Sequence, residues 1–590
     1  MEEAISREVD VLIIGAGLAG LTLARQLLLA EPEIRILMVD RGEEIPSPKQ
    51  KVGEATVQVS GYYYSKVLDL EEYLLQEQYL KYNLRFYWKS QRGGDVWEDL
   101  SQSYIRKISN IATFQLDRNT FEAEVLRRNR ESASFELVHP ATGLDVELNE
   151  EEGPHAFRFD AGGREVTGRA AWVVDASGRN RFLARRRKLE RPSPIRHGAS
   201  FLWVDGLLDP EKCSNLTQKE RRVRPERSVL GHFPTFLATN HYCGEGYWFW
   251  EIPLHGKTSL GLVYDAALIS SKDVSTADKL VEWICREYPL YARDLPQRKI
   301  LHHSGYTSFA LDSGQTISPS GWALCGEACR FTDPLYSPGG DLISIYNTLI
   351  TDAILTRDRQ ELEAKVRFYE PLARAVYEAY VPSFAVSYCT LGDQECFSLR
   401  YVWELTVYFA FYVFPFINDL HVNRSFLPAF LRRFGNLGPV NQGMHRLLAD
   451  FYRWKKENVI LATPEPVFFE FMEVGALASA ELTFYKVGVS LDEARQVLDE
   501  QLENLRDLAR WTAAHVASVV LDDPRAATNA AFIKGIDVEN LQFDPEAMAG
   551  QLEAACRETS EAYVWRFDVP CMKRFRTERL AVEEPMEAVG

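Results

Sequence analysis

A glycine fingerprint near the N-terminus constrains the fold more than any other feature of this chain. Three glycines at G-x-G-x-x-G spacing follow the apolar run Val11–Ile14: Gly15, Gly17 and Gly20. Glycines at these places permit a tight turn, close approach of a pyrophosphate, and close packing of the following helix on the strand. A second apolar run over residues 34–39 ends in Asp40, which is placed to accept a hydrogen bond from a ribose hydroxyl. The sequence therefore predicts a Rossmann-like βαβ unit that binds a dinucleotide.

Composition and charge narrow the class of protein. The chain has 590 residues, 46% hydrophobic and 26% charged, so we expect two or three folded units. Its formal charge of −17 argues against binding to nucleic acid or to anionic membrane surfaces. The nine cysteines are scattered and no histidine lies close to Cys325 and Cys329 in the sequence. We predict no metal site and a reducing compartment.

Apolar segments give no sign of a membrane span. The N-terminus lacks the apolar core of a signal peptide. The longest apolar run, residues 405–417, is too short to cross a bilayer and contains Pro415. We expect a cytoplasmic protein.

The order of the elements predicts an α/β chain with an inserted sheet and a helical end. We expect a discontinuous nucleotide-binding domain over residues 1–196 and 308–356, because a strand leading to Asp175 and a glycine-rich loop near residue 326 return to the first sheet. Residues 197–307 are rich in predicted strands, and residues 357–590 have helical periodicity almost throughout. We also expect a helix over residues 117–128, a helix from Leu342 and a strand over residues 80–88.

Five further stretches carry more specific information than the glycine fingerprint. They are Lys51–Thr56 (KVGEAT), Lys81 with Arg85 and Phe86, Gln115–Arg118 (QLDR), Trp248–Pro253 (WFWEIP), and Asp333–Gly340 (DPLYSPGG). Together they resemble the motifs of the tryptophan-halogenase family of flavin-dependent halogenases. The resemblance covers about residues 9 to 350, and the helical remainder has no recognised counterpart.

The resemblance implies the FAD-binding fold of flavoprotein monooxygenases and halogenases. It implies a halogenase that uses FADH2, oxygen and chloride or bromide, with Lys81 as the catalytic residue that carries hypohalous acid to the substrate. Since no second G-x-G-x-x-G fingerprint occurs, we expect a separate reductase to supply the FADH2. Trp248 and Trp250 point to one face of a strand and are expected to line the passage between flavin and substrate.

The cofactor-binding residues predicted from the fingerprint and from the resemblance form one set: Gly15, Gly17, Gly20, Asp40, Glu54, Ala55, Arg118, Asp175, Glu327 and Asp333. The predicted halide site is Ser337, Gly339 and Gly340, since successive N–H groups at a helix start make an anion-binding concavity. Two residues depart from the family pattern. Pro338 has no N–H to donate, and Glu327 stands where these proteins usually have aspartate.

The predicted substrate is an electron-rich arene other than tryptophan. Relatives that halogenate free tryptophan carry glutamate at the position of Tyr336, and a neutral tyrosine cannot act as that base. We expect a phenol or pyrrole, and leave open whether it is free or held by an acyl or peptidyl carrier protein. The aromatic residues of 401–417 either pack in the core, form a homodimer face, or line a substrate pocket. An FAD-dependent monooxygenase without halide use is the alternative function.

Overall fold

A parallel sheet near the N-terminus carries the glycine fingerprint. The computed structural model describes residues 5–151, 153–214, 216–223 and 234–580. The strands of this first sheet, in spatial order, are β18 (Ile317–Ser318), β19 (Trp322–Leu324), β10 (Glu165–Asp175), β1 (Ile5–Ile14), β2 (Ile36–Val39) and β7 (Phe135–Val138). The antiparallel strands β8 (Ala141–Glu147) and β9 (His155–Ala161) extend it from β10. The strands β1, β2, β7, β10 and β19 pair in parallel, as expected for a βαβ unit.

Three helices pack together over this sheet. They are α1 (Leu18–Ala30), α4 (Arg118–Asn129) and α9 (Pro338–Leu355). Helix α4 lies where the sequence predicts it, and its N-cap Asp117 accepts a hydrogen bond from the backbone N–H of Asn119. Helix α9 begins at Pro338, four residues before the predicted start at Leu342. Proline is favoured at the first helical position because its fixed φ suits the helix and its missing N–H is not needed there.

The second sheet collects strands from all three parts of the chain. In spatial order they are β16 (Ile300–Tyr306), β12 (His197–Asp205), β15 (Lys257–Asp265), β14 (Tyr247–Leu254), β13 (Thr239–Gly244), β4 (Leu84–Lys89), β5 (Leu100–Tyr104) and β20 (Phe468–Glu470). Strands β4, β5 and β20 lie outside 197–307, so the sheet extends beyond the predicted insert. The predicted strand over residues 80–88 is interrupted: β3 covers Tyr79–Leu80, and Lys81 lies in the link to β4.

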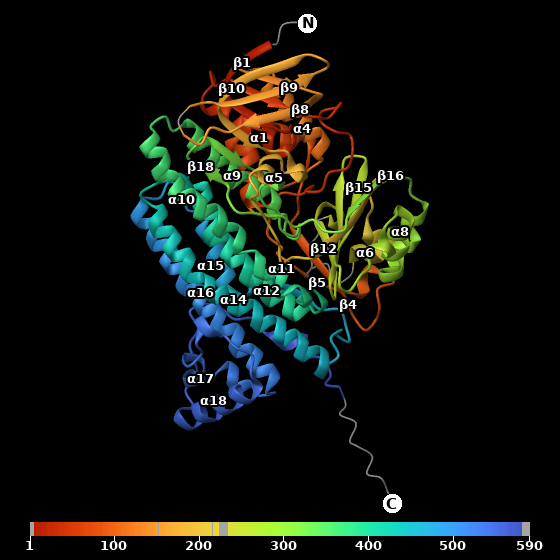
Figure 1. Cartoon of the computed structure of the whole chain (residues 1–590). Helices are drawn as coiled ribbons and strands as arrows, with labels where there is room; N and C mark the ends of the chain where they lie inside the picture. Colours follow the sequence, from red (N-terminus) through yellow and green to blue (C-terminus); the bar gives the residue numbers. More distant parts are fainter. Residues whose placement is uncertain (1–4, 152, 215, 224–233, 581–590) are drawn as a thin grey trace, which may run out of the picture.

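Long helices cover the two sheets on one side (Figure 1). The main ones are α10 (Arg359–Glu378), α12 (Gln394–Tyr408), α14 (Leu427–Asn458), α15 (Gly475–Thr483) and α16 (Leu491–Val520). Helix α18 (Pro545–Glu558) lies beyond them, where it packs on α16 and α17 (Ala530–Lys534). Helix α10 packs on α9 and β18, while α12 packs on β5. One hydrophobic core therefore runs from the first sheet into the helical region. None of the described helices is long and apolar enough to cross a membrane.

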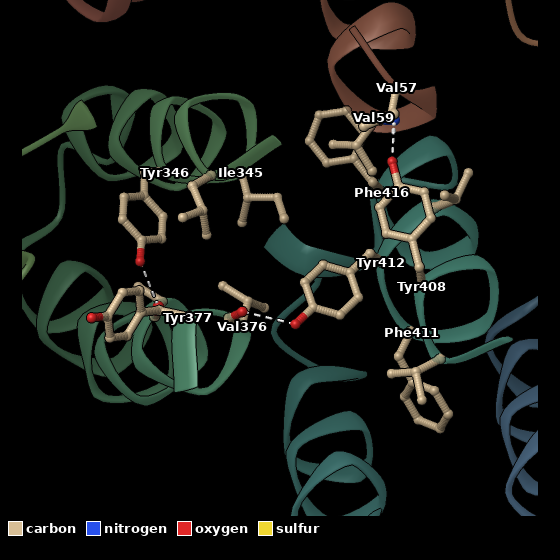
Figure 2. Packing of buried hydrophobic residues seen from close by; sticks show 14 of the residues in the cluster. Val57, Val59, Ile345, Tyr346, Val376, Tyr377, Tyr408, Phe411, Tyr412 and Phe416 are labelled. Carbon is tan, nitrogen blue, oxygen red and sulfur yellow. Dashed lines mark hydrogen bonds between the residues drawn. The ribbon is translucent and has the colours of Figure 1, made fainter. Parts of the chain in front are cut away.

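The aromatic stretch at the end of α12 is divided between core and cavity. Phe411 and Tyr412 are buried, and the Tyr412 hydroxyl donates to the Val376 carbonyl oxygen at 2.8 Å (Figure 2). Tyr408 accepts the Val59 N–H at 3.0 Å and also lines a cavity, together with Phe409. Because this stretch is enclosed by its own chain, it does not provide a homodimer face.

Candidate active site

The glycine loop has the geometry that a bound pyrophosphate requires. Gly15 has a φ of +108°, and a Cβ there would lie 2.4 Å from the Ala176 carbonyl oxygen. A Cβ on Gly20 would lie 2.2 Å from the Gly15 carbonyl oxygen, so this glycine lets α1 approach β1. A Cβ on Gly17 would meet nothing within 4 Å. Gly17 therefore borders open space at the start of α1, where helix N–H groups are unpaired.

Two cavities flank this loop and fit the two halves of FAD. The cavity of about 290 Å³, hereafter the first cavity, is lined by Gly17, Glu54, Arg118, Glu327 and Gly339 among others. A cavity of about 410 Å³ contains Gly15 and Asp40 on the other side. The Asp40 carboxylate accepts the Ala16 N–H at 2.8 Å, which holds it beside the loop. The residues present thus fit an extended dinucleotide whose pyrophosphate crosses Gly17.

Glu54 is the buried acid of the first cavity. Its carboxylate accepts from Trp203 Nε1 at 2.6 Å and from Ser259 Oγ at 2.5 Å. Trp250 Nε1 donates to the same Ser259 Oγ at 3.1 Å, so the tryptophan and the acid are joined through one hydroxyl. Burial raises the pKa of Glu54 to about 7, against the hydrogen bonds that lower it. Glu54 can therefore hold or release a proton near neutral pH beside the cofactor.

Trp248 and Trp250 lie together on one face of β14, as their spacing predicts. Their ring centroids are 5.6 Å apart, and both rings line the first cavity. Trp248 Nε1 donates to Asp333 Oδ1 at 3.2 Å, while Asp333 Oδ2 lies 2.7 Å from His197 Nδ1. The tryptophans therefore shape the cavity wall, and Asp333 ties that wall to the loop before α9.

Glu251 lies on the opposite face of β14 and gives a testable pH dependence. It accepts from the Tyr291 hydroxyl at 2.5 Å, and burial raises its pKa to about 8. Between about pH 4.5 and 8 the folded state binds more protons at this site than the unfolded state does. Stability therefore falls as pH rises through this window, by up to about 1.4 kcal/mol per pH unit.

The variant Glu251→Gln should remove that contribution. The melting temperatures of parent and variant are measured at pH 5.5 and at pH 7.5. The drop in melting temperature between these two pH values should be smaller for the variant than for the parent. The exposed Glu245, which pairs with Lys456, supplies the control Glu245→Gln, which should keep the parent's dependence. Equal slopes in Glu251→Gln and parent would contradict the burial of a protonated acid.

Lys81 stands between the first cavity and a second, smaller one. Its ammonium donates to the Thr56 carbonyl oxygen, and its own N–H donates to the Thr113 carbonyl oxygen at 2.8 Å. Thr56 lines the first cavity, whereas Lys81 lines the second, which measures about 100 Å³. The side chain is 4% exposed, and burial lowers its pKa to about 7. Lys81 can thus exchange a proton at neutral pH.

The wall between the cavities is formed by neighbouring residues that face opposite ways. Thr56, Ser337 and Gly340 line the first cavity, while Val57, Tyr336 and Asp341 line the second. Ser337, with a φ of +59°, is the N-cap of α9. Gly339 and Gly340 are the second and third helical residues, whose N–H groups have no partner within the helix. The predicted halide donors therefore face the first cavity. Pro338 suits the first helical position but contributes no N–H to this loop.

The chain is similar to known flavoproteins in sequence. The family model described as "Lycopene cyclase protein" matches residues 10–190. The flavin-dependent halogenase chlA of Dictyostelium discoideum is 27% identical over 72% of this chain and 73% of its own length. The 1H-pyrrole-2-carbonyl-(peptidyl-carrier protein) chlorinase of Pseudomonas fluorescens is 24% identical over 56% of this chain and 72% of its own.

Solved structures agree with the sequence matches. The halogenase PltM, in a complex with phloroglucinol and FAD, covers 85% of this chain and 96% of its own at a TM-score of 0.54 and 16% identity. The flavin-dependent halogenase CmlS covers 76% of this chain and 78% of its own at a TM-score of 0.51 and 19% identity. This chain has the fold of the flavin-dependent halogenases. The predicted fold class and the resemblance are confirmed.

The halogenase fold brings most, but not all, of the predicted residues to the cavities. Those that line them are Gly15, Gly17, Asp40, Glu54, Ala55, Lys81, Arg118, Trp248, Trp250, Glu327, Ser337, Gly339 and Gly340. Gly20 lies beneath the loop, in the contact between helix and strand. Asp175 is fully buried and accepts the N–H groups of Ser177 and Leu183 at 2.9 and 2.7 Å. Asp175 and Asp333 therefore hold loops of the site, and their contact with FAD stays a prediction.

Sequence reasoning identified some of the residues that line the second cavity and missed others. Tyr401, Tyr408 and Phe409 belong to the stretch 401–417, for which a substrate pocket was one alternative, and Tyr336 lies in the predicted halide motif. The missed residues include Gln58 in α2 (Gln58–Tyr62), Asp341, Tyr380 and Glu404. Among these, only Asp341 follows a recognised motif, directly after Gly340. Its position in the first turn of a helix was a weak signal, because acids are common there for helix stability alone.

Proposed function

We propose that this chain is an FAD-dependent halogenase that adds chlorine or bromine to an electron-rich arene. The observation that supports this most directly is the place of Lys81, which joins Thr56 in the wall of the first cavity to the second cavity. When bound, reduced FAD supplies the electrons with which oxygen and halide give hypohalous acid. The chain's part is to hold halide at Ser337, Gly339 and Gly340, and to pass the oxidised halogen along Lys81.

The second cavity supports a substrate with a single aromatic ring. About 100 Å³ is small for a fused ring system, and Tyr336, Tyr401 and Phe409 give it aromatic walls. Two of the similar proteins take rings of that size: the Pseudomonas fluorescens chlorinase acts on a pyrrole-2-carbonyl group on a carrier protein, and PltM binds phloroglucinol. We therefore propose a phenol or pyrrole, free or attached to an acyl or peptidyl carrier protein.

The proposal also includes a flavin reductase, a cytoplasmic setting and the division of the chain into domains. A separate flavin reductase fits a chain with one dinucleotide fingerprint, and we propose a cytoplasmic setting in which that reductase supplies FADH2. The division of the chain into residues 1–196 with 308–356, residues 197–307, and residues 357–590 also stays a proposal. A homodimer stays a prediction that sedimentation would test.

A halide-dependence assay tests the proposed function. Purified holoenzyme receives reduced FAD, oxygen and a panel of phenols and pyrroles, with bromide, with chloride, or with neither. We expect halogenated products only when halide is present. Products without halogen throughout the panel, hydroxylated or unchanged, would contradict the proposal.

An FAD-dependent monooxygenase is the second candidate, because Pro338 removes one backbone donor from the halide loop. The two candidates differ in halide binding. Bromide soaked into crystals should give anomalous density beside Gly339 and Gly340 if the chain is a halogenase. A site without bromide, combined with hydroxylated products, would favour the monooxygenase.

A further inference from the structure

Two carboxylates of the second cavity, Asp341 and Glu404, each have a buried oxygen without a hydrogen-bond partner among the described residues. Asp341 is 1% exposed and lines this cavity from the first turn of α9. Its Oδ1 accepts the Ser60 N–H at 2.9 Å. Its Oδ2 is buried and has no hydrogen-bond partner among the described residues. Leaving such an oxygen unsatisfied is costly, so Asp341 is built to accept a hydrogen bond from a ligand.

The groups around Asp341 allow it to exchange a proton. Burial raises its pKa to about 6, while the nearby Tyr408 hydroxyl, Ser60 and the charge of Lys81 lower it. Burial lowers the pKa of Lys81 to about 7 in the same cavity. The ionisable groups that face Asp341 from the elements packed on it are Lys81, Tyr64, Tyr380, Tyr408 and Tyr412. The tyrosines have raised pKa values, so Lys81 and Asp341 are the pair that exchanges protons at neutral pH.

Glu404, the second of these acids, differs from Asp341 because its other oxygen is part of an ion pair. Its Oε1 accepts from Arg400 Nε at 3.0 Å and from the Ser383 hydroxyl. Arg400 is fully buried, so Glu404 already has a cationic partner beside it. Asp341 has no such cation in hydrogen-bond contact among the described residues. Of the two acids, Asp341 is thus the one whose carboxylate has no cation bound to it in the part of the chain that the structure describes.

We propose that Asp341 is a catalytic base: its Oδ2 accepts the hydroxyl or ring N–H of the arene and removes that proton as the ring is halogenated. This inference rests on the proposed function and adds to it a requirement on the substrate. The arene must carry an ionisable O–H or N–H conjugated with the carbon that reacts. The uncompensated oxygen, placed in an aromatic cavity beside Lys81, selects for such a donor.

The step balances in atoms and electrons. A ring carbon attacks the halogen of hypohalous acid, so a carbon–halogen bond forms and the oxygen–halogen bond breaks. The departing hydroxide takes a proton from the Lys81 ammonium and becomes water, while the O–H or N–H proton goes to Asp341. The ring then regains aromaticity by moving its C–H proton to the oxygen or nitrogen, and Asp341 returns its proton to Lys81. The arene is oxidised by two electrons and the halogen is reduced from +1 to −1.

The variant Asp341→Asn tests this role, because asparagine keeps the acceptor for Ser60 but cannot take a proton. Holoenzyme is assayed with phenols of nearly constant size but falling pKa, made by adding fluorine. We expect halogenation of the parent phenol to fall roughly 10²- to 10⁴-fold. The loss should shrink as the phenol becomes ionised in solution, because an ionised phenol needs no base.

Two controls separate the possible failures. Asp352→Asn changes an acid on the same helix that pairs with Lys365, and it should leave halogenation unchanged. A diffusible β-diketone that traps hypohalous acid is assayed in each variant. Absence of trapped halogen in the parent would mean that the proposed function itself fails. Trapped halogen with an equal loss for every phenol, or with no loss at all, would overturn the role of Asp341 alone.

Discussion

Replacing Lys81 with methionine is expected to lower arene halogenation roughly 10²- to 10⁴-fold while reduced FAD is still oxidised by oxygen. Methionine keeps the length of the side chain but cannot hold hypohalous acid, donate a proton or bind the Thr56 carbonyl oxygen. FAD binding should persist, because Lys81 lines the second cavity and not the first. Product analysis together with flavin absorbance measures both effects.

The same variant has a second readout in stability. The folded pKa of Lys81 is about 7, below the value near 10.5 of an exposed lysine. Between those values the unfolded state binds more protons, so the site's contribution to stability rises with pH over this window. Lys81→Met should therefore flatten the rise in melting temperature between pH 7 and 9. The exposed Lys66 pairs with Glu71, and Lys66→Met should behave as the parent does. Undiminished halogenation by Lys81→Met would refute the role of the lysine.

Substitutions at two glycines of the fingerprint are expected to have different effects, one on stability and the other on FAD binding. Gly20→Ala places a methyl group 2.2 Å from the Gly15 carbonyl oxygen, so strand and helix must separate. We expect a loss of about 3 kcal/mol or more in the free energy of unfolding, or failure to fold. Gly17→Val places its side chain in open space and should keep the parent's melting temperature. It should nevertheless weaken FAD binding tenfold or more, about 1.4 kcal/mol, because the side chain fills the room for the pyrophosphate.

Thermal melting of the apoproteins and FAD titration distinguish these outcomes. The pair serves as its own control, since both substitutions alter the same loop within three residues. Wild-type FAD affinity in Gly17→Val would show that the pyrophosphate does not cross Gly17. An unchanged melting temperature in Gly20→Ala would contradict the packing of α1 on β1.

Local sequence patterns predicted much of the fold and part of the candidate site. The glycine fingerprint, helix α4 and the shared face of Trp248 and Trp250 each depend on spacing within a few residues, so periodicity predicts them. The glycine-rich motif before Leu342 predicts a loop, but α9 begins at Pro338, because proline suits the first helical position.

The features that the sequence did not predict depend on contacts between residues far apart in the chain. Strand β20 pairs with β5 across more than 350 residues of sequence, and no local pattern predicts such a partner. The same is true of Asp333, whose motif suggested cofactor contact but whose oxygens bind Trp248 and His197. The free oxygen of Asp341 depends on which atoms from α2 and α12 surround it, and burial of a single atom has no signature in sequence.

Isotope-labelled oxygen gives the most direct test of the central claim, that oxidised halide passes along Lys81 to a ring in the second cavity. Holoenzyme with reduced FAD, bromide and ¹⁸O₂ is given a trihydroxybenzene, and the product mass is measured. If oxidised halide reaches the ring along Lys81, the product is an arene with the bromine isotope doublet and no ¹⁸O, and Lys81→Met gives almost none of it. An arene that gains ¹⁸O and no bromine would contradict it.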